Sequence, residues 1–166
     1  MAGPLIVIAE LGQGDFARLD ALRRDYYPPE RNRVPAHLTL IRSLPPSAEM
    51  EVRHSLARAA SREPPQAEIS GLLDLDNGVA LRVHSPELER IHEELATEFH
   101  GLLTSQDQGR WTPHVTIQNK VEPRVARALF RLLREGFEPR QLEVTGLQLV
   151  RYVDGAWEPI SRWRFR

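Results

Sequence analysis

Two tetrapeptides in this sequence carry side chains that suit proton-transfer chemistry. Residues 37–40 read His-Leu-Thr-Leu and residues 114–117 read His-Val-Thr-Ile, so the pattern His-apolar-Thr-apolar occurs twice. The unperturbed pKa of histidine lies near neutral pH, which lets one imidazole act as a base and another as an acid. A threonine hydroxyl donates a hydrogen bond to an anionic oxygen. The two tetrapeptides therefore contain the candidate catalytic residues.

Each tetrapeptide is predicted to begin a β-strand, in which alternate side chains share a face. The histidine and threonine of one copy then point to one side, and its two apolar residues point to the opposite side, into a core. If the two strands meet, four polar side chains converge on one cleft, namely His37, Thr39, His114 and Thr116.

Such a set suits the chemistry of phosphate esters. One imidazole takes a proton from the attacking oxygen while the other protonates the leaving oxygen, and the two hydroxyls bind the non-bridging oxygens, where charge concentrates. A single copy is also typical of an ordinary strand, because Thr is common in strands. A second copy of the motif, at the start of a matching strand in the other half of the chain, favours a catalytic role over a purely structural one.

Apolar periodicity predicts short strands that alternate with amphipathic helices. Strands are expected at residues 5–9, 37–44, 66–75, 79–84, 114–118, 141–152 and 157–165. Helices are expected from an Asp15 cap to residue 26, from Ser47, from a Ser85 cap with inward-facing Leu88, Ile91, Leu95, Phe99 and Leu102, and from Pro123 to Gly136. Residues 76–78 (Asp-Asn-Gly) and 154–155 (Asp-Gly) predict hairpin turns.

The order of these elements is duplicated. A strand, helix, strand, helix, strand series begins at Leu5 and begins again at Val79, and the two histidine patterns lie 114 minus 37, or 77, residues apart. The chain of 166 residues is long enough for one globular domain, spanning 1–166. We expect its two halves, at about 1–77 and 78–166, to form similar lobes.

With these two motifs the sequence resembles the two-histidine (2H) phosphoesterase superfamily, and most closely its bacterial 2'-5' RNA ligase and cyclic phosphodiesterase branch. The resemblance covers nearly the whole chain, and Pro113 before the second motif also fits it. It implies an α+β fold with two lobes related by a pseudo-twofold axis, each a mainly antiparallel sheet with helices on its outer side. The family's functional positions fall on His37, Thr39, His114 and Thr116, in a cleft between the lobes.

The resemblance also implies an activity. We expect metal-independent hydrolysis of 2',3'-cyclic phosphates or 2'-5' linkages, with RNA ends or small cyclic-phosphate nucleotides as the partners. Two alternatives stay open: a module that binds a nucleotide or RNA end without turning it over, and an RNA 2'-5' ligase or transfer enzyme, since the same acid and base work in reverse. Turnover of a 2',3'-cyclic nucleotide separates the first alternative from an enzyme.

Four residues near the motifs are candidates for substrate binding. Trp111 could stack on a base, although an aromatic residue at a core boundary explains it equally well. Arg31, Arg33 and Arg110 precede the motifs and could bind a phosphate group, although arginines in loops are usually only solvated. Strict alternation predicts that Arg42 shares the face of Leu38 and points away from the cleft.

Composition excludes several other classes of function. A net charge of -1 argues against a wholly basic nucleic-acid coat, and the absence of cysteine excludes a thiolate zinc site or a cysteine nucleophile. No stretch has the roughly 18 apolar residues of a membrane span. We therefore expect a cytoplasmic monomer with no metal, no cofactor, no membrane contact and no obligate protein partner.

Overall fold

The computed structural model of the chain describes residues 3–166, which form seven strands and four α-helices. The strands are β1 (Leu5–Leu11), β2 (Leu38–Leu44), β3 (Gln66–Asp74), β4 (Val79–His84), β5 (His114–Gln118), β6 (Arg140–Val153) and β7 (Ala156–Arg164). The helices are α1 (Gln13–Tyr26), α2 (Glu49–Ala59), α3 (Pro86–Glu98) and α4 (Pro123–Glu135). The predicted order of strands and helices is confirmed.

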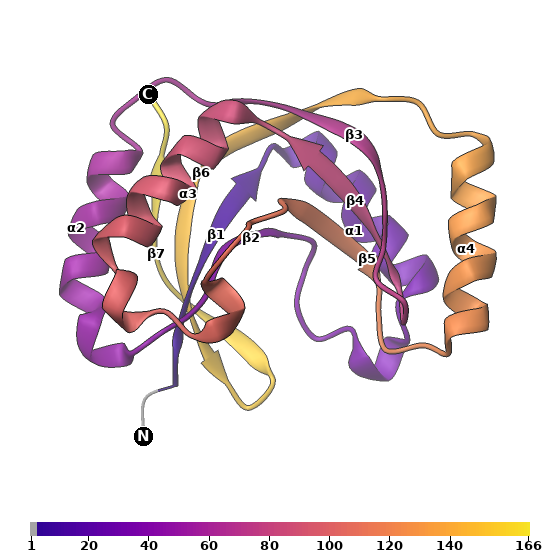
Figure 1. Cartoon of the computed structure of the whole chain (residues 1–166), viewed down its shortest axis with the longest axis horizontal. Coiled ribbons are helices and arrows are strands. Elements are labelled where there is room, and N and C mark those ends of the chain that lie inside the picture. The colour runs from indigo at the N-terminus through magenta and orange to yellow at the C-terminus, as the bar shows by residue number, and fades with distance from the viewer. Residues whose placement is uncertain (1–2) are drawn as a thin grey trace.

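The strands pair antiparallel in the order β2-β1-β6-β3-β4-β5, and β7 pairs with β6. β6 serves both parts of this sheet, because its residues 144–151 pair with β1 and its residues 140–143 pair with β3. The two end strands of the path, β2 and β5, contact each other in the middle of the molecule (Figure 1). The predicted α+β class with antiparallel pairing is confirmed.

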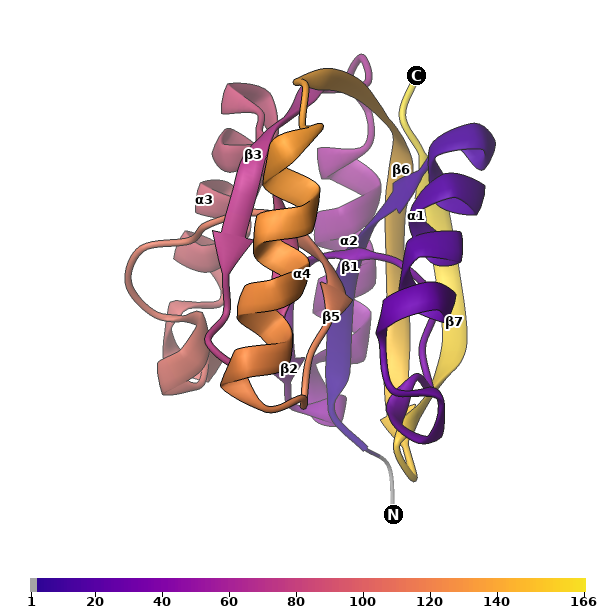
Figure 2. The same cartoon turned by 90° about the vertical axis from the view of Figure 1, so that its right-hand side faces the viewer.

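The helices pack around the sheet in two groups. α2 and α3 lie beside each other at one side of the molecule, while α4 packs on β3 and β4 and α1 packs on β5 (Figures 1 and 2). α3 packs through Leu88, Ile91 and Leu95, each at most 2% exposed. Because α1 packs on β5, the first helix contacts a strand that lies far along the chain. A pseudo-twofold relation between lobes at 1–77 and 78–166 stays a prediction, and its boundary falls in the turn between β3 and β4.

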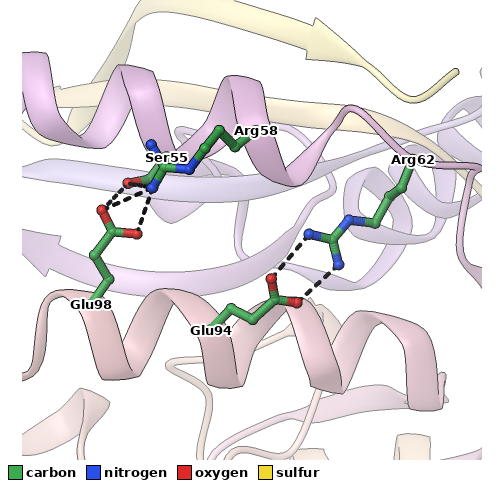
Figure 3. Close-up of polar contacts among 5 residues, drawn as sticks. All are labelled: Ser55, Arg58, Arg62, Glu94 and Glu98. Atoms are coloured by element: carbon green, nitrogen blue, oxygen red, sulfur yellow. Dashed lines mark hydrogen bonds and ion pairs between the residues drawn. The ribbon is translucent and has the colours of Figure 1, made fainter.

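Charged side chains link the two helices of the first group (Figure 3). Arg62, just after α2, donates two hydrogen bonds of 2.9 and 3.0 Å to the carboxylate of Glu94 on α3. This pairing raises the pKa of Arg62 and lowers the pKa of Glu94. Glu98 accepts further hydrogen bonds from Ser55 and Arg58 of α2. These contacts join a helix that precedes β3 to one that follows β4.

Three local predictions are confirmed by the backbone. Ser85 caps α3, since its hydroxyl accepts a hydrogen bond of 3.2 Å from the Leu88 N–H. Asp76 has a φ of 70° in the turn between β3 and β4. Asp154 and Gly155 have φ values of 50° and 84° between β6 and β7, as a tight hairpin with a right-handed twist requires.

Two other local predictions are wrong. Asp15 does not cap α1, because this helix begins at Gln13, after Gly12. The carboxylate of Asp15 instead accepts a hydrogen bond of 2.7 Å from the Glu143 N–H of β6. Leu102 is not turned inward, because α3 ends at Glu98 and the side chain of Leu102 is 45% exposed. The contact with β6 explains the orientation of Asp15, and the early end of α3 explains the exposure of Leu102.

Candidate active site

One cavity of about 650 Å³ contains both histidine motifs. His37, Thr39, His114 and Thr116 all line it, because β2 and β5 are the two ends of the strand path and contact each other. The strand that carries each motif is thus far from its partner along the sheet, and the fold brings the two together. Four groups that could act on one substrate share a single cavity.

Strand alternation presents the motifs to this cavity. Leu38 is fully buried and Leu40 is 1% exposed, while Val115 and Ile117 are fully buried. The histidines and threonines between them are partly exposed. The predicted division of each motif into one core face and one open face is confirmed at every position.

Both imidazoles are held by the same backbone contact. The Nδ1 atom of His37 lies 2.8 Å from the carbonyl oxygen of Pro35, and the Nδ1 atom of His114 lies 2.8 Å from that of Thr112. A carbonyl oxygen only accepts hydrogen bonds, so Nδ1 carries the proton and donates it. In a neutral ring the lone pair then resides on Nε2. Each histidine is oriented with Nε2 available for proton transfer.

The surroundings of His37 hold its ring in the neutral form. Burial, together with the positive charges of Arg23 and His114, lowers its pKa from 6.5 to about 4, although the hydrogen bond to the carbonyl of Pro35 raises it. The indole of Trp157 on β7 packs edge-on against the imidazole, with ring centroids 4.4 Å apart and an interplanar angle of 68°. At neutral pH this histidine can accept a proton.

Trp111 lines the same cavity and is fixed by two contacts. Its indole Nε1–H donates a hydrogen bond of 3.2 Å to the carbonyl oxygen of Thr39. Its ring stacks on that of His92, with centroids 4.3 Å apart and an interplanar angle of 7°. Burial lowers the pKa of His92, which favours a neutral stacking partner. The indole of Trp111 therefore lies beside the first motif in an orientation that two contacts fix.

Residues 13–156 match the family model described as the 2'-5' RNA ligase superfamily. The chain belongs to this superfamily, the 2H phosphoesterases. The match spans most of the chain and includes both motifs. Comparison with curated proteins finds no match.

Solved structures show that the fold is the LigT-like fold. TT0787 of Thermus thermophilus is similar with a TM-score of 0.66 at 18% identity, covering 98% of each chain. Escherichia coli LigT complexed with 3'-AMP has a TM-score of 0.64 at 18% identity, covering 99% of each chain. A further structure described as a phosphoesterase has a TM-score of 0.64 at 17% identity, covering 99% of each chain.

The arginines near the motifs of this superfamily member lie in different places. Arg110 lines the cavity. Arg31 and Arg33 are exposed and do not line it, and Arg33 donates a hydrogen bond of 3.3 Å to the carbonyl oxygen of Asp154 at the hairpin between β6 and β7. Contact of these arginines with a phosphate group stays a prediction.

Arg42 lines the cavity, contrary to the expectation from strict alternation. The register of β2 on β1 shifts where Val7 faces Ile41 and Ile8 faces Thr39, which leaves Leu40 as an extra residue. A β-bulge of this kind turns the following side chains. The carboxylate of Asp107 also binds the N–H of Arg42 at 2.9 Å and so holds the strand against the loop that carries Trp111.

Sequence reasoning did not single out two residues next to the motifs, Trp157 and Arg23. Each reaches its motif from a distant part of the chain: Trp157 through β7, and Arg23 through α1, 93 residues from the strand residue that it binds. Arginine is abundant in this sequence, so its type carried no signal. Only the tertiary fold identifies these two neighbours.

The cavity does not have the donor set of a metal site. Among residues 3–166, no group of three or more His, Asp or Glu side chains is arranged to hold a metal ion. In the same part of the chain no helix is both long and apolar enough to cross a bilayer. The polar and aromatic groups that line the cavity are imidazoles, hydroxyls, an indole, guanidiniums, side-chain amides and the carboxylate of Asp107.

Proposed function

We propose that this member of the 2'-5' RNA ligase superfamily is a phosphodiesterase that hydrolyses 2',3'-cyclic phosphates or 2'-5' linkages at RNA ends or in small nucleotides. The observation that carries the proposal is the convergence of two His-x-Thr motifs from β2 and β5 on one cavity, with each imidazole held through Nδ1. One substrate phosphate can then contact two proton-transfer groups and two hydroxyls.

In this proposal His37 is the base and His114 is the acid. The ring of His37, whose pKa is about 4, is neutral at pH 7 and takes a proton from the attacking water through Nε2. The water oxygen bonds to phosphorus while the bond from phosphorus to the 2' oxygen breaks. His114 gives its proton to that departing oxygen, so that one proton is taken up and one is released in each turnover.

Thr39 and Thr116 have a supporting role in the reaction. Their hydroxyls donate hydrogen bonds to the two non-bridging phosphate oxygens, whose charge is stabilised most strongly in the transition state. Each threonine lies two residues after its histidine, so the strand fixes the distance between the proton-transfer group and the hydroxyl. The reaction needs no redox step and no metal.

Trp111 supports a nucleotide as the substrate class. Its indole is already fixed by the Thr39 carbonyl and by His92, so a base that stacks on it has little side-chain motion to restrict. E. coli LigT, which shares this fold, has been crystallised with 3'-AMP and with ATP. We propose that a base stacks on Trp111 while the phosphate lies between the histidines.

Turnover of 2',3'-cyclic mononucleotides in excess EDTA tests this function. We expect hydrolysis to continue in EDTA and to give a single phosphomonoester. Binding without turnover would support a recognition module instead. Joining of 5'-hydroxyl and cyclic-phosphate RNA ends without net hydrolysis would support a ligase. Loss of activity in EDTA and its return with a divalent metal would contradict the two-histidine mechanism.

A further inference from the structure

Arg23 on α1 is a buried cation that the proposed reaction does not use. Its side chain lies in the interior, at 2% exposure. Its Nη1 donates a hydrogen bond of 2.9 Å to the carbonyl oxygen of Thr116, and its Nε and Nη2 donate bonds of 3.1 and 3.0 Å to Oδ1 of Asn32. The guanidinium also stacks over the ring of Tyr27 at 4.4 Å. Each of these partners is neutral.

No ion pair within residues 3–166 includes Arg23. Asp20, one turn earlier on α1, is already used, since its carboxylate accepts the Ala36 N–H and an Arg24 N–H, both at 2.9 Å. Burial lowers the pKa of Arg23, and the charge of Asp20 and the contact with Tyr27 offset only part of this effect. A buried charge with only neutral partners costs free energy that a purely structural link between two segments would not require.

The position of Arg23 relates it to both motifs. It binds the backbone of Thr116 in the second motif, and through Asn32 it holds the segment that leads into the first motif. Its charge is also felt at His37, where it disfavours the protonated ring. The one buried cation without a carboxylate partner in the described chain therefore lies behind the cavity where an anionic phosphate is proposed to bind.

We infer that Arg23 is a positioning residue that supplies a fixed positive charge to the phosphate site and holds Thr116 in place, an inference that rests on the proposed function. The charge acts through the protein interior, where electrostatic interactions are screened less than in water. It needs no direct contact with the substrate. The phosphate anion thus adds a second counter-charge to that of Asp20, which acts on Arg23 without forming an ion pair with it.

The substitution Asn32→Asp separates this role from a structural one. Aspartate has nearly the same shape as asparagine and keeps the acceptor oxygen for Nε and Nη2, but it adds a negative charge next to Arg23. If Arg23 only links two segments, the variant keeps the link and forms a buried ion pair. If Arg23 serves the phosphate site, the new carboxylate neutralises the charge of Arg23, and that charge no longer attracts the phosphate.

The experiment measures binding of inorganic phosphate, followed by the NMR signals of His37 and His114. We expect Asn32→Asp to raise the Kd of phosphate about tenfold, and to raise the pKa of His37 because the repulsion from Arg23 is offset. The melting temperature should not fall. Unchanged phosphate affinity in Asn32→Asp would overturn the inference, as would a wild-type protein that does not bind phosphate in the cavity.

Two further variants give the control and a second readout. Arg62→Gln removes a partly exposed guanidinium paired with Glu94, and phosphate affinity should not change. Arg23→Lys keeps the charge but not the three hydrogen bonds. It should therefore reduce the free energy of unfolding by more than it reduces the free energy of phosphate binding. The reverse pattern would contradict the inference. Neither binding nor titration requires turnover: a protein that shows these shifts but hydrolyses no cyclic nucleotide would refute the proposed function alone.

Discussion

The two histidine motifs share a sequence pattern and a backbone contact, but their surroundings differ. In both, the imidazole Nδ1 binds the carbonyl oxygen two residues earlier at 2.8 Å. His37 lies just before β2 and packs against Trp157, whereas His114 is the first residue of β5 and faces Arg82 across the strand pair. A duplicated motif can therefore supply two similar groups that the fold then prepares for different roles.

The largest expected effect comes from removing either imidazole. We expect His37→Ala and His114→Ala each to lower kcat on a 2',3'-cyclic nucleotide by roughly 10² to 10⁴, because each removes one of the two proposed proton-transfer groups. The double variant should lose much less than the product of the single losses, since both rings act on one transition state. Circular dichroism should show that the fold is retained. A loss in the double variant equal to the product of the single losses would contradict the proposal that both histidines act on one transition state.

The threonines should show a smaller effect, and a similar one in both motifs. In the proposed mechanism Thr39→Val and Thr116→Val each remove one hydrogen bond to a charged oxygen, which we expect to cost about 1 to 3 kcal/mol in transition-state stabilisation. The ratio of kcat/KM between wild type and variant measures this cost. A loss at only one threonine would show that a single motif binds the phosphate oxygens.

Trp157 tests the difference between the motifs directly. Trp157→Ala should let water reach the ring of His37, and this would raise the pKa of His37 from about 4 toward its ordinary value. The acidic limb of the kcat/KM profile should then move to higher pH, while Trp157→Phe should move it less. A profile that keeps its acidic limb in Trp157→Ala would assign the low pKa of His37 to other neighbours.

The smallest effect concerns stability. Because the folded-state pKa of His37 is lowered from 6.5 to about 4, the unfolded chain binds more protons between these values. The contribution of the neutral ring to stability is present above pH 6.5 and is lost as the pH falls toward 4. The melting temperature should therefore drop less between about pH 7.5 and 5 in His37→Gln than in wild type. An equal drop would contradict the lowered pKa.

Much of the geometry of the candidate site was predictable because its signal is local. The alternation of His-x-Thr with buried apolar residues depends only on strand geometry, and its repetition pointed to a shared cavity. The turn at residues 154–155 and the Ser85 cap were predictable for the same reason, since each depends on neighbouring residues. Local patterns also identified all seven strands and four helices to within a few residues.

The remainder depends on contacts between distant segments. Arg23 meets Thr116 because α1 packs on β5, and no periodicity within either element indicates that pairing. The orientation of Arg42 follows from a bulge in β2 that only its register against β1 reveals. Asp15 had the sequence signature of a helix cap, but the backbone of β6 takes its carboxylate. For Arg42 and Asp15, pairing between distant segments overrode the local expectation.

The most direct test of distinct roles for His37 and His114 is the pH dependence of kcat/KM for a 2',3'-cyclic nucleotide in the two single alanine variants. Wild type should give a bell-shaped profile, because it needs one neutral and one protonated imidazole. We predict that His37→Ala loses the acidic limb and that His114→Ala loses the alkaline limb. Near-wild-type turnover in either variant, or the same limb lost in both, would contradict the account.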